Sequence, residues 1–197
     1  MKDNLLIHIH GFLSANNADR VVALQTHVSE HQLNLDVISP QLPENPQPAM
    51  ETLEKIIQQE ITQRQSITLV GYSLGGYFAT WLASRYKLRT VLVNPIVRGY
   101  DIMCEFFGEC YNPHTDVKFS IGEQDIEFLI SIYLETLPDP ELFLVMLQLG
   151  DEITDPKDAL EYYAQCELLV EDGGTHEFEH FEKHLETVFN FLYPSGC

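Results

Sequence analysis

The sequence TLVGYSLGGYFATWLA, residues 68–83, carries the strongest indication of the fold. Its apolar start is typical of a buried β-strand and its end of a helix, so the residues between them must turn sharply. Those residues, Gly71-Tyr72-Ser73-Leu74-Gly75, match the pattern G-x-S-x-G in the strand–turn–helix setting of a nucleophile elbow. Such a turn lifts a serine hydroxyl out of the sheet edge, and glycine fits beside it because larger side chains would clash. We therefore predict Ser73 as a nucleophile.

The alternative is that the pattern occurs by chance and that its glycines only let a helix pack closely on a sheet. The helix predicted from about Leu74 has unpaired N–H groups and the positive end of its dipole at its start. We therefore expect the Leu74 N–H to bind a developing oxyanion.

A second oxyanion donor is expected after the first apolar run, which ends in HIHGFLS, residues 8–14. In this kind of fold, a loop after an early strand supplies a second N–H. Gly11 lets that backbone approach closely, which favours the Phe12 N–H as the donor, with Leu13 as the next choice. The alternative is an ordinary glycine turn.

The rest of the chain alternates short apolar runs with segments of helical period. Strands are predicted at Leu5–Ile9, Leu33–Ile38, Ser66–Val70, Thr90–Asn94, Glu141–Leu149 and Cys166–Val170. The fifth run is leucine-rich and fits a helix as well. The proline-rich residues 39–48 are predicted to be a loop. This alternation predicts one α/β domain over residues 1–197, with about six mostly parallel strands and helices on both faces.

One segment, from about Ile96 to Leu137, breaks this rhythm. It contains MCEFFGECYNPH, residues 103–114, which matches no strand pattern, and a helical segment from about Glu123. Long connections in compact domains are often functional. Residues 96–137 are therefore expected to be either a small lid-like insertion over a site or a long connection with its own packing.

A serine hydroxyl needs a histidine base that is oriented by a carboxylate. In the chain order Ser, Asp, His, these residues follow strands, because ligands gather at the C-terminal ends of parallel strands. Asp151 follows the fifth predicted strand and His176 the sixth, so we predict the triad Ser73, Asp151 and His176. Glu152 and Asp155 compete with Asp151, which could instead be a turn residue. His176 could be a surface histidine, whereas His180 and His184 are expected to be solvated on the final helix.

The stretch GGTHEFEH, residues 173–180, also contains H-E-x-x-H, the spacing of a helical zinc site. Gly173 and Gly174 place His176 at or before the helix start, where it is poorly placed to form a rigid metal pair with His180. The extended zinc pattern fails as well, because Lys183 and Glu186 stand in its last two positions. His8 and His10 are expected at the mouth of the site. We therefore predict no metal.

Composition limits the partners and the compartment. The chain has 197 residues and a formal net charge of −19, which disfavours nucleic acid and anionic membranes. The N-terminus lacks the features of a signal peptide, and the longest apolar run, LFLVML, is too short to cross a bilayer. The four cysteines form no metal-binding pattern and are expected to be reduced thiols. These features predict a cytoplasmic protein without membrane insertion.

Five segments in order resemble the YqiA/YcfP-like group of small bacterial esterases in the α/β-hydrolase superfamily. They are IHIHGFLSANNA, GYSLGGYFATWLA, VLVNPIVR, GDEITDPKDALEYYA and GGTHEFEHFE, and the resemblance is weakest from about Cys104 to Phe143. It implies hydrolysis of carboxylic esters or thioesters by Ser73, Asp151 and His176. It also implies a compact member that lacks the early edge strands of larger hydrolases. Tyr72 departs from the pattern, which favours a smaller residue beside the nucleophile. This difference could alter access for the leaving group but leaves the triad unchanged.

The sequence therefore predicts a serine hydrolase that acts on a small acyl ester or thioester without a cofactor. Two alternatives are a catalytically idle hydrolase fold that only binds a ligand and an H-E-x-x-H zinc enzyme. The acidic surface disfavours highly anionic substrates, although Arg98 could offset it locally. Candidates for an apolar acyl pocket, which are equally plausible as core, are Phe12, Tyr72, Phe106, Phe107 and Tyr111.

Overall fold

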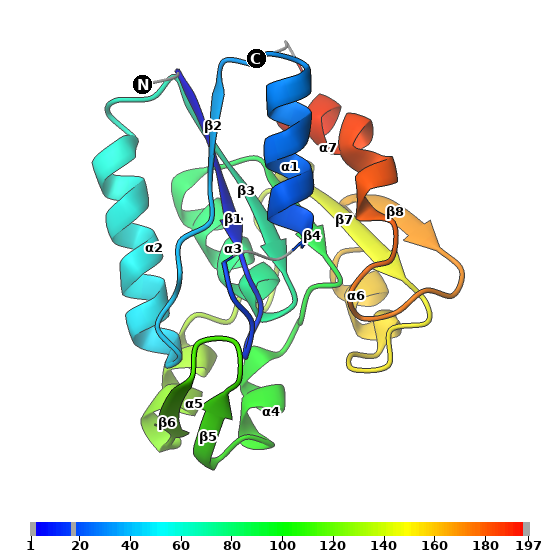
Figure 1. Cartoon of the computed structure of the whole chain (residues 1–197). Helices are drawn as coiled ribbons and strands as arrows, with labels where there is room; N and C mark the ends of the chain where they lie inside the picture. The colour runs from blue at the N-terminus through cyan, green and yellow to red at the C-terminus, as the bar shows by residue number, and fades with distance from the viewer. Residues whose placement is uncertain (1–2, 17–18, 195–197) are drawn as a thin grey trace.

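A parallel sheet of six strands forms the centre of the molecule (Figure 1). The computed structural model describes residues 3–16 and 19–194. The strands lie in the order β2-β1-β3-β4-β7-β8, and every neighbouring pair is parallel. They are β1 (Asn4–Ile9), β2 (Leu35–Ile38), β3 (Ser66–Tyr72), β4 (Thr90–Val93), β7 (Phe143–Gln148) and β8 (Glu167–Glu171). The predicted α/β class is confirmed.

Helices cover both faces of the sheet because side chains alternate along each strand. Leu5, Ile7 and Ile9 of β1 point to one face and Leu6 to the other, and all four are buried. The first face packs against α2 (Pro46–Glu60), α3 (Leu74–Tyr86) and α6 (Pro156–Tyr162). The second face packs against α1 (Asp19–Glu30) and α7 (Leu185–Leu192), which lie side by side on the right in Figure 1.

The segment between β4 and β7 forms its own small group of elements. It contains α4 (Gly99–Cys104), β5 (Gly108–Asn112), β6 (Val117–Ile121), α5 (Glu123–Ser131) and the 3-10 turn η1 (Pro140–Leu142). Figure 1 shows α4, α5 and the β5–β6 hairpin at the end of the molecule to which the central strands point, whereas η1 leads into the start of β7. The helix expected from about Glu123 is confirmed.

The prediction that residues 103–114 contain no strand is wrong. β5 lies within them and pairs antiparallel with β6. This hairpin is half exposed, with polar and apolar residues mixed along β5, so it lacks the continuous apolar run that marks the central strands.

Several predicted boundaries also differ from the structure. The loop predicted over residues 39–48 ends early, because Pro46 begins α2 and proline suits a first helical position. The fourth strand ends before Asn94, whose φ of 39° breaks the strand. The ambiguous fifth run is strand β7, and α4 and α6 were not predicted because each is only six or seven residues long.

Two further observations concern membrane-spanning helices and the cysteines. Within residues 3–16 and 19–194, no helix combines the length and the apolar character needed to cross a membrane. Cys104, Cys110 and Cys166 are free thiols, and Cys197 lies outside the described residues.

The close packing of α3 against β1 at Gly75 can be tested by substitution. A Cβ built on Gly75 would lie 2.2 Å from the carbonyl oxygen of Ile9 and 2.5 Å from that of His10. Gly75→Ala should therefore lower the free energy of unfolding by about 3 kcal/mol, because β1 or α3 must shift. A urea titration would measure this loss.

Gly122→Ala is the matched control, since a Cβ there would have no neighbour within 4 Å. Gly122 precedes α5, so this change should cost less than about 1 kcal/mol. Equal losses of stability in the two variants would contradict the packing argument.

Candidate active site

Ser73 occupies a strained turn between β3 and α3. Its φ of 53° and ψ of −121° are unfavourable for a residue with a side chain, as expected for a nucleophile elbow. The backbone is held in this conformation because the Ser73 carbonyl accepts hydrogen bonds from Gly76 and Ile96. A Cβ on Gly71 would lie 2.6 Å from the Cβ of Ala79, so glycine is required there for helix and strand to meet.

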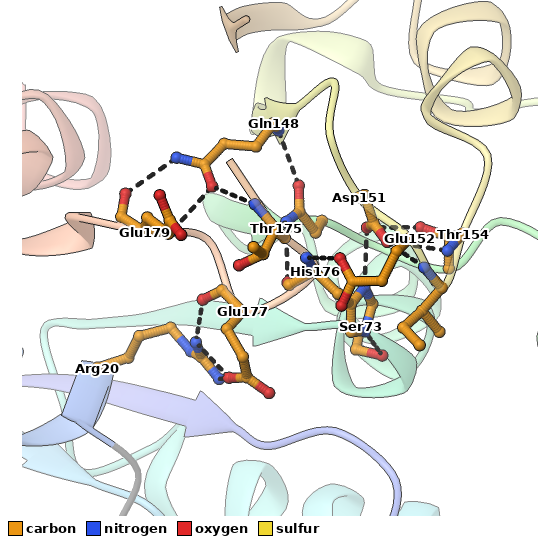
Figure 2. A network of polar contacts seen from close by, with 12 residues as sticks. Arg20, Ser73, Gln148, Asp151, Glu152, Thr154, Thr175, His176, Glu177 and Glu179 are labelled. Atoms are coloured by element: carbon orange, nitrogen blue, oxygen red, sulfur yellow. Dashed lines mark hydrogen bonds and ion pairs between the residues drawn. The ribbon is translucent and has the colours of Figure 1, made fainter. Parts of the chain in front are cut away.

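The three residues predicted as a triad lie in one chain of hydrogen bonds (Figure 2). His176 Nε2 is 2.9 Å from Ser73 Oγ, and His176 Nδ1 is 2.8 Å from Asp151 Oδ2. Ser73 and His176 are both buried, which shields this chain from bulk water. With Asp151 ionised, Nδ1 carries the imidazole proton and Nε2 is free to accept the serine proton.

Asp151 is held as an ionised acceptor. Its Oδ1 accepts the Ile153 and Thr154 N–H groups, each at 2.9 Å, and its Oδ2 accepts the Thr154 hydroxyl at 2.7 Å. Burial alone would raise the pKa of Asp151, but the hydrogen bonds from His176 and Thr154 outweigh it and hold the pKa below its ordinary value.

The two competing acids have other partners. Glu152 Oε2 accepts the backbone N–H of His176 at 3.0 Å, so it fixes the main chain of the histidine and not its ring. Asp155 caps α6 by accepting the Lys157 N–H at 3.0 Å. Of the three carboxylates in this loop, Asp151 is the one bonded to the imidazole.

Asn94 and Gln148, which the sequence analysis did not select, anchor the loop that carries His176. Asn94 Nδ2 donates to the carbonyls of Thr175 and His176, and its Oδ1 accepts the Gln148 N–H. Gln148 Oε1 accepts the N–H groups of Thr175 and Glu179 (Figure 2). The only sequence signal was a polar residue at the end of two apolar strands.

Phe12 and Leu74 carry the expected oxyanion donors. A Cβ on Gly11 would lie 3.2 Å from Ser73 Cβ, so the loop that leads to Phe12 passes directly beside Ser73. Leu74 begins α3 immediately after Ser73. Neither N–H donates to another backbone group within the described part of the chain. Both are therefore available to bind a negatively charged oxygen.

The expectation that His8 and His10 lie at the mouth of the site is wrong for His8. His8 is fully buried, with Nδ1 3.0 Å from Ser39 Oγ. His10 instead holds the loop that carries the expected oxyanion donor, Gly11–Phe12, which we call the oxyanion loop. Its Nδ1 lies 2.9 Å from the Gly11 carbonyl, and its Nε2 accepts the Leu42 N–H. Burial lowers the pKa of His10, which keeps Nε2 available as this acceptor.

The H-E-x-x-H motif does not form one turn of a helix. His176 and His180 both precede the 3-10 turn η2 (Phe181–His184), and the His176 ring is bonded to Ser73 and Asp151. His180 is exposed as expected, but His184 is largely buried against Phe178. In residues 3–16 and 19–194, no group of three or more His, Cys, Asp and Glu side chains is arranged to hold a metal.

The five aromatic candidates for an acyl pocket are dispersed. Phe12 packs edge-on against Phe106, with ring centroids 5.0 Å apart, so the segment between β4 and β7 touches the oxyanion loop. Phe107 and Tyr111 are 60% and 47% exposed on the hairpin, whereas Tyr72 is buried.

A cavity of about 190 Å³ lies beside the loop that follows Asp151, residues 151–155. Ile96 and Thr154, which line it, bond the Ser73 carbonyl and the Asp151 carboxylate respectively. Arg98 also lines it but is paired with two carboxylates, so its charge is already compensated. The acidic residues of the lining are Asp101, Glu105, Asp155 and Asp158.

The parallel sheet, the elbow and the loops that bring Ser73, His176 and Asp151 together define an α/β-hydrolase fold. Solved structures agree with this class. Over 98% of the chain and 89% of the other protein, it matches the ferulic-acid complex of Est1E from Butyrivibrio proteoclasticus with a TM-score of 0.74 at 15% identity. Mouse α/β-hydrolase domain-containing protein 10 matches with the same TM-score over 96% and 90% of the two chains at 17% identity.

Within this class, the chain belongs to the family described as Uncharacterised protein family (UPF0227), whose sequence model matches residues 5–193. A relative is the UPF0227 protein YcfP of Escherichia coli, which is 24% identical over 189 residues, covering 95% of this chain and 98% of that protein. The resemblance stated from the sequence is confirmed.

The buried His8 predicts a pH dependence of stability. Burial, and then the nearby Arg20 charge, lower its pKa from 6.5 to about 3. Between these values the unfolded chain binds a proton that the folded protein does not, so folding stability must fall as the pH drops below 6.5. His8→Gln should remove this contribution, making the unfolding free energy about 1.4 kcal/mol per pH unit less steep between pH 6 and 4.

Urea titrations of the two proteins across this range would measure the slopes. Equal slopes would contradict the assignment of His8 as a buried neutral histidine.

Proposed function

We propose that this protein is a serine hydrolase that cleaves carboxylic esters, or acyl thioesters, through an acyl-enzyme on Ser73. The observation that carries the proposal is the unbroken hydrogen-bond chain from Ser73 through His176 to Asp151. His176 takes the serine proton as Oγ attacks the acyl carbon, and Asp151 stabilises the imidazolium that forms. The Phe12 and Leu74 N–H groups bind the oxyanion, each contributing about 3 kcal/mol to transition-state stabilisation.

The reaction is completed without a cofactor. The tetrahedral intermediate collapses, the bond to the leaving oxygen or sulfur breaks, and the leaving group takes the proton from His176. Water then attacks the acyl carbon while His176 removes its proton. The carboxylic acid leaves and the proton returns to Ser73 Oγ.

The fold neighbours support a hydrolase, because one of them is the esterase domain of a Rhodothermus marinus protein, which matches with a TM-score of 0.67 at 16% identity. We propose residues 96–137 as a lid-like part of the single domain over the entrance to the site. Two contacts support this placement: Phe106 packs against Phe12, and Asn112 Nδ2 donates to the Ser14 carbonyl at 3.2 Å.

A fluorophosphonate probe tests the proposal directly, because it reacts only with an activated serine. The folded protein should form one adduct per chain, and peptide mass mapping should find it on Ser73. Labelling should be lost in Ser73→Ala, fall by at least about 100-fold in rate in His176→Ala, and be unchanged by a chelator.

Absence of any adduct on the folded protein would contradict the proposal and favour a binding protein. Esterase activity that a chelator abolishes would favour the zinc alternative.

We propose that the ester approaches Ser73 past the cavity beside residues 151–155. The four carboxylates in the lining of this cavity then predict selectivity for neutral or cationic esters. A succinyl ester of a phenol should have a kcat/KM about tenfold below that of its neutral methyl succinyl counterpart at low ionic strength. The ratio should shrink as salt is added, because salt screens the repulsion.

Glu105→Gln should bring the kcat/KM values of the two esters closer together. Glu51→Gln, at an exposed position on α2, should leave their ratio unchanged. Equal kcat/KM values for the two esters at low salt would contradict the role assigned to this lining.

A further inference from the structure

Tyr72 stands beside the nucleophile but lies behind the active site. It is 4% exposed and packs with Val70, Val93 and Phe178 on the face covered by α1 and α7. Its ring therefore belongs to the apolar core on that face, and its effect on leaving-group access stays a prediction. Burial raises the pKa of its hydroxyl, so Tyr72 stays neutral and is not a candidate acid or base at neutral pH.

The Tyr72 ring lies against both the His176 ring and the loop that carries Gly11 and Phe12. Its centroid lies 5.3 Å from that of the His176 ring, with an angle of 45° between the planes. A Cβ built on Gly11 would lie 3.2 Å from Tyr72 Cδ1 and 3.3 Å from Cε1, so the ring also packs against the oxyanion loop. One buried aromatic side chain thus contacts both the His176 ring and the loop that carries Phe12.

Arg20 of α1 supports this ring from behind. Its guanidinium carbon lies 3.6 Å from the Tyr72 ring centroid, within the range of a cation–π contact. The same guanidinium donates to the backbone carbonyl of Glu177, at 2.5 Å, and to its carboxylate, at 3.2 Å (Figure 2). Glu177 directly follows His176, so Arg20 grips the histidine loop at the residue next to the base.

Burying the charged Arg20 guanidinium costs free energy that its partners must offset. Arg20 is 7% exposed although it carries a charge, and arginine is rarely buried unless it is paired, as Arg20 is with Glu177. Its planar donors reach a carbonyl and a carboxylate together while its face covers an aromatic ring, a combination that lysine does not reproduce.

We propose that Tyr72 and Arg20 are positioning residues that hold the His176 ring and the Gly11–Phe12 backbone in register with Ser73. The Tyr72 ring separates the His176 ring from the Gly11–Phe12 backbone. Arg20 holds both this ring and the loop that carries His176 and Glu177 in place. The reactive use of this register rests on the proposed function, whereas the register itself is a structural property that can be measured without turnover.

Kinetics of paired variants test the proposal. Tyr72→Leu and Arg20→Met should each lower kcat at least about tenfold while KM changes less than about threefold, because reacting groups are misplaced and substrate contacts are kept. Tyr72→Phe keeps the ring and should recover most of the loss, whereas Arg20→Lys should recover little.

Arg89 provides a matched control. Its guanidinium carbon lies 4.6 Å from the centroid of Phe191 and its Nε donates to the Phe191 carbonyl at 2.8 Å, so it repeats the Arg20 arrangement away from Ser73. Arg89→Met should lower thermal stability without changing kcat. A loss of kcat in Arg89→Met equal to that in Arg20→Met would overturn the proposal, because both would then act through general stability.

A spectroscopic measurement separates this proposal from the proposed function. The proton shared by His176 Nδ1 and Asp151 should give a low-field proton NMR resonance in the wild-type protein. Tyr72→Leu and Arg20→Met should shift or broaden it, and Tyr72→Phe and Arg89→Met should not.

A resonance unchanged in both Tyr72→Leu and Arg20→Met would overturn the positioning role even in an active esterase. The expected pattern in a protein that hydrolyses no ester would uphold the positioning role and reject the proposed function. If Tyr72→Leu does not fold, the comparison of Arg20→Met with Arg89→Met decides the outcome.

Discussion

The structure depends on one unfavourable backbone conformation, the positive φ of Ser73. Such a conformation persists only where its surroundings determine it completely. Here Gly71 and Gly75 let β3, α3 and β1 approach within distances that no side chain allows, and the Ser73 carbonyl is bonded by Gly76 and Ile96. The packing that stabilises the central sheet therefore also holds the Ser73 backbone in its unfavourable conformation.

The loops around the elbow are held by buried polar side chains and not by regular secondary structure. Asn94 and Gln148 fix the backbone of the histidine loop, Glu152 fixes the His176 N–H, and His10 fixes the oxyanion loop. Each of these side chains joins two segments that are far apart in the sequence. These side-chain hydrogen bonds keep the loops in fixed positions, because the loops have no regular backbone hydrogen bonding of their own.

The sequence was sufficient for the parts governed by local rules. The G-x-S-x-G pattern and continuous apolar runs such as Leu5–Ile9 predicted the sheet and the elbow, and chain order selected Asp151 and His176. The hairpin of β5 and β6 was missed because its half-exposed strands have no clear period. The roles of Arg20 and Asn94 could not be predicted, since each depends on contacts with residues more than 80 positions away.

Different esters of one acid should all form the same acyl-enzyme on Ser73, and the partition of its acyl group between water and methanol tests this. Several esters of one acid with different leaving groups would be hydrolysed in water containing methanol, and the ratio of methyl ester to free acid measured. An acyl-enzyme on Ser73 predicts the same ratio for every leaving group, because all substrates pass through one intermediate. A ratio that varies with the leaving group, or no turnover of any ester, would contradict the account.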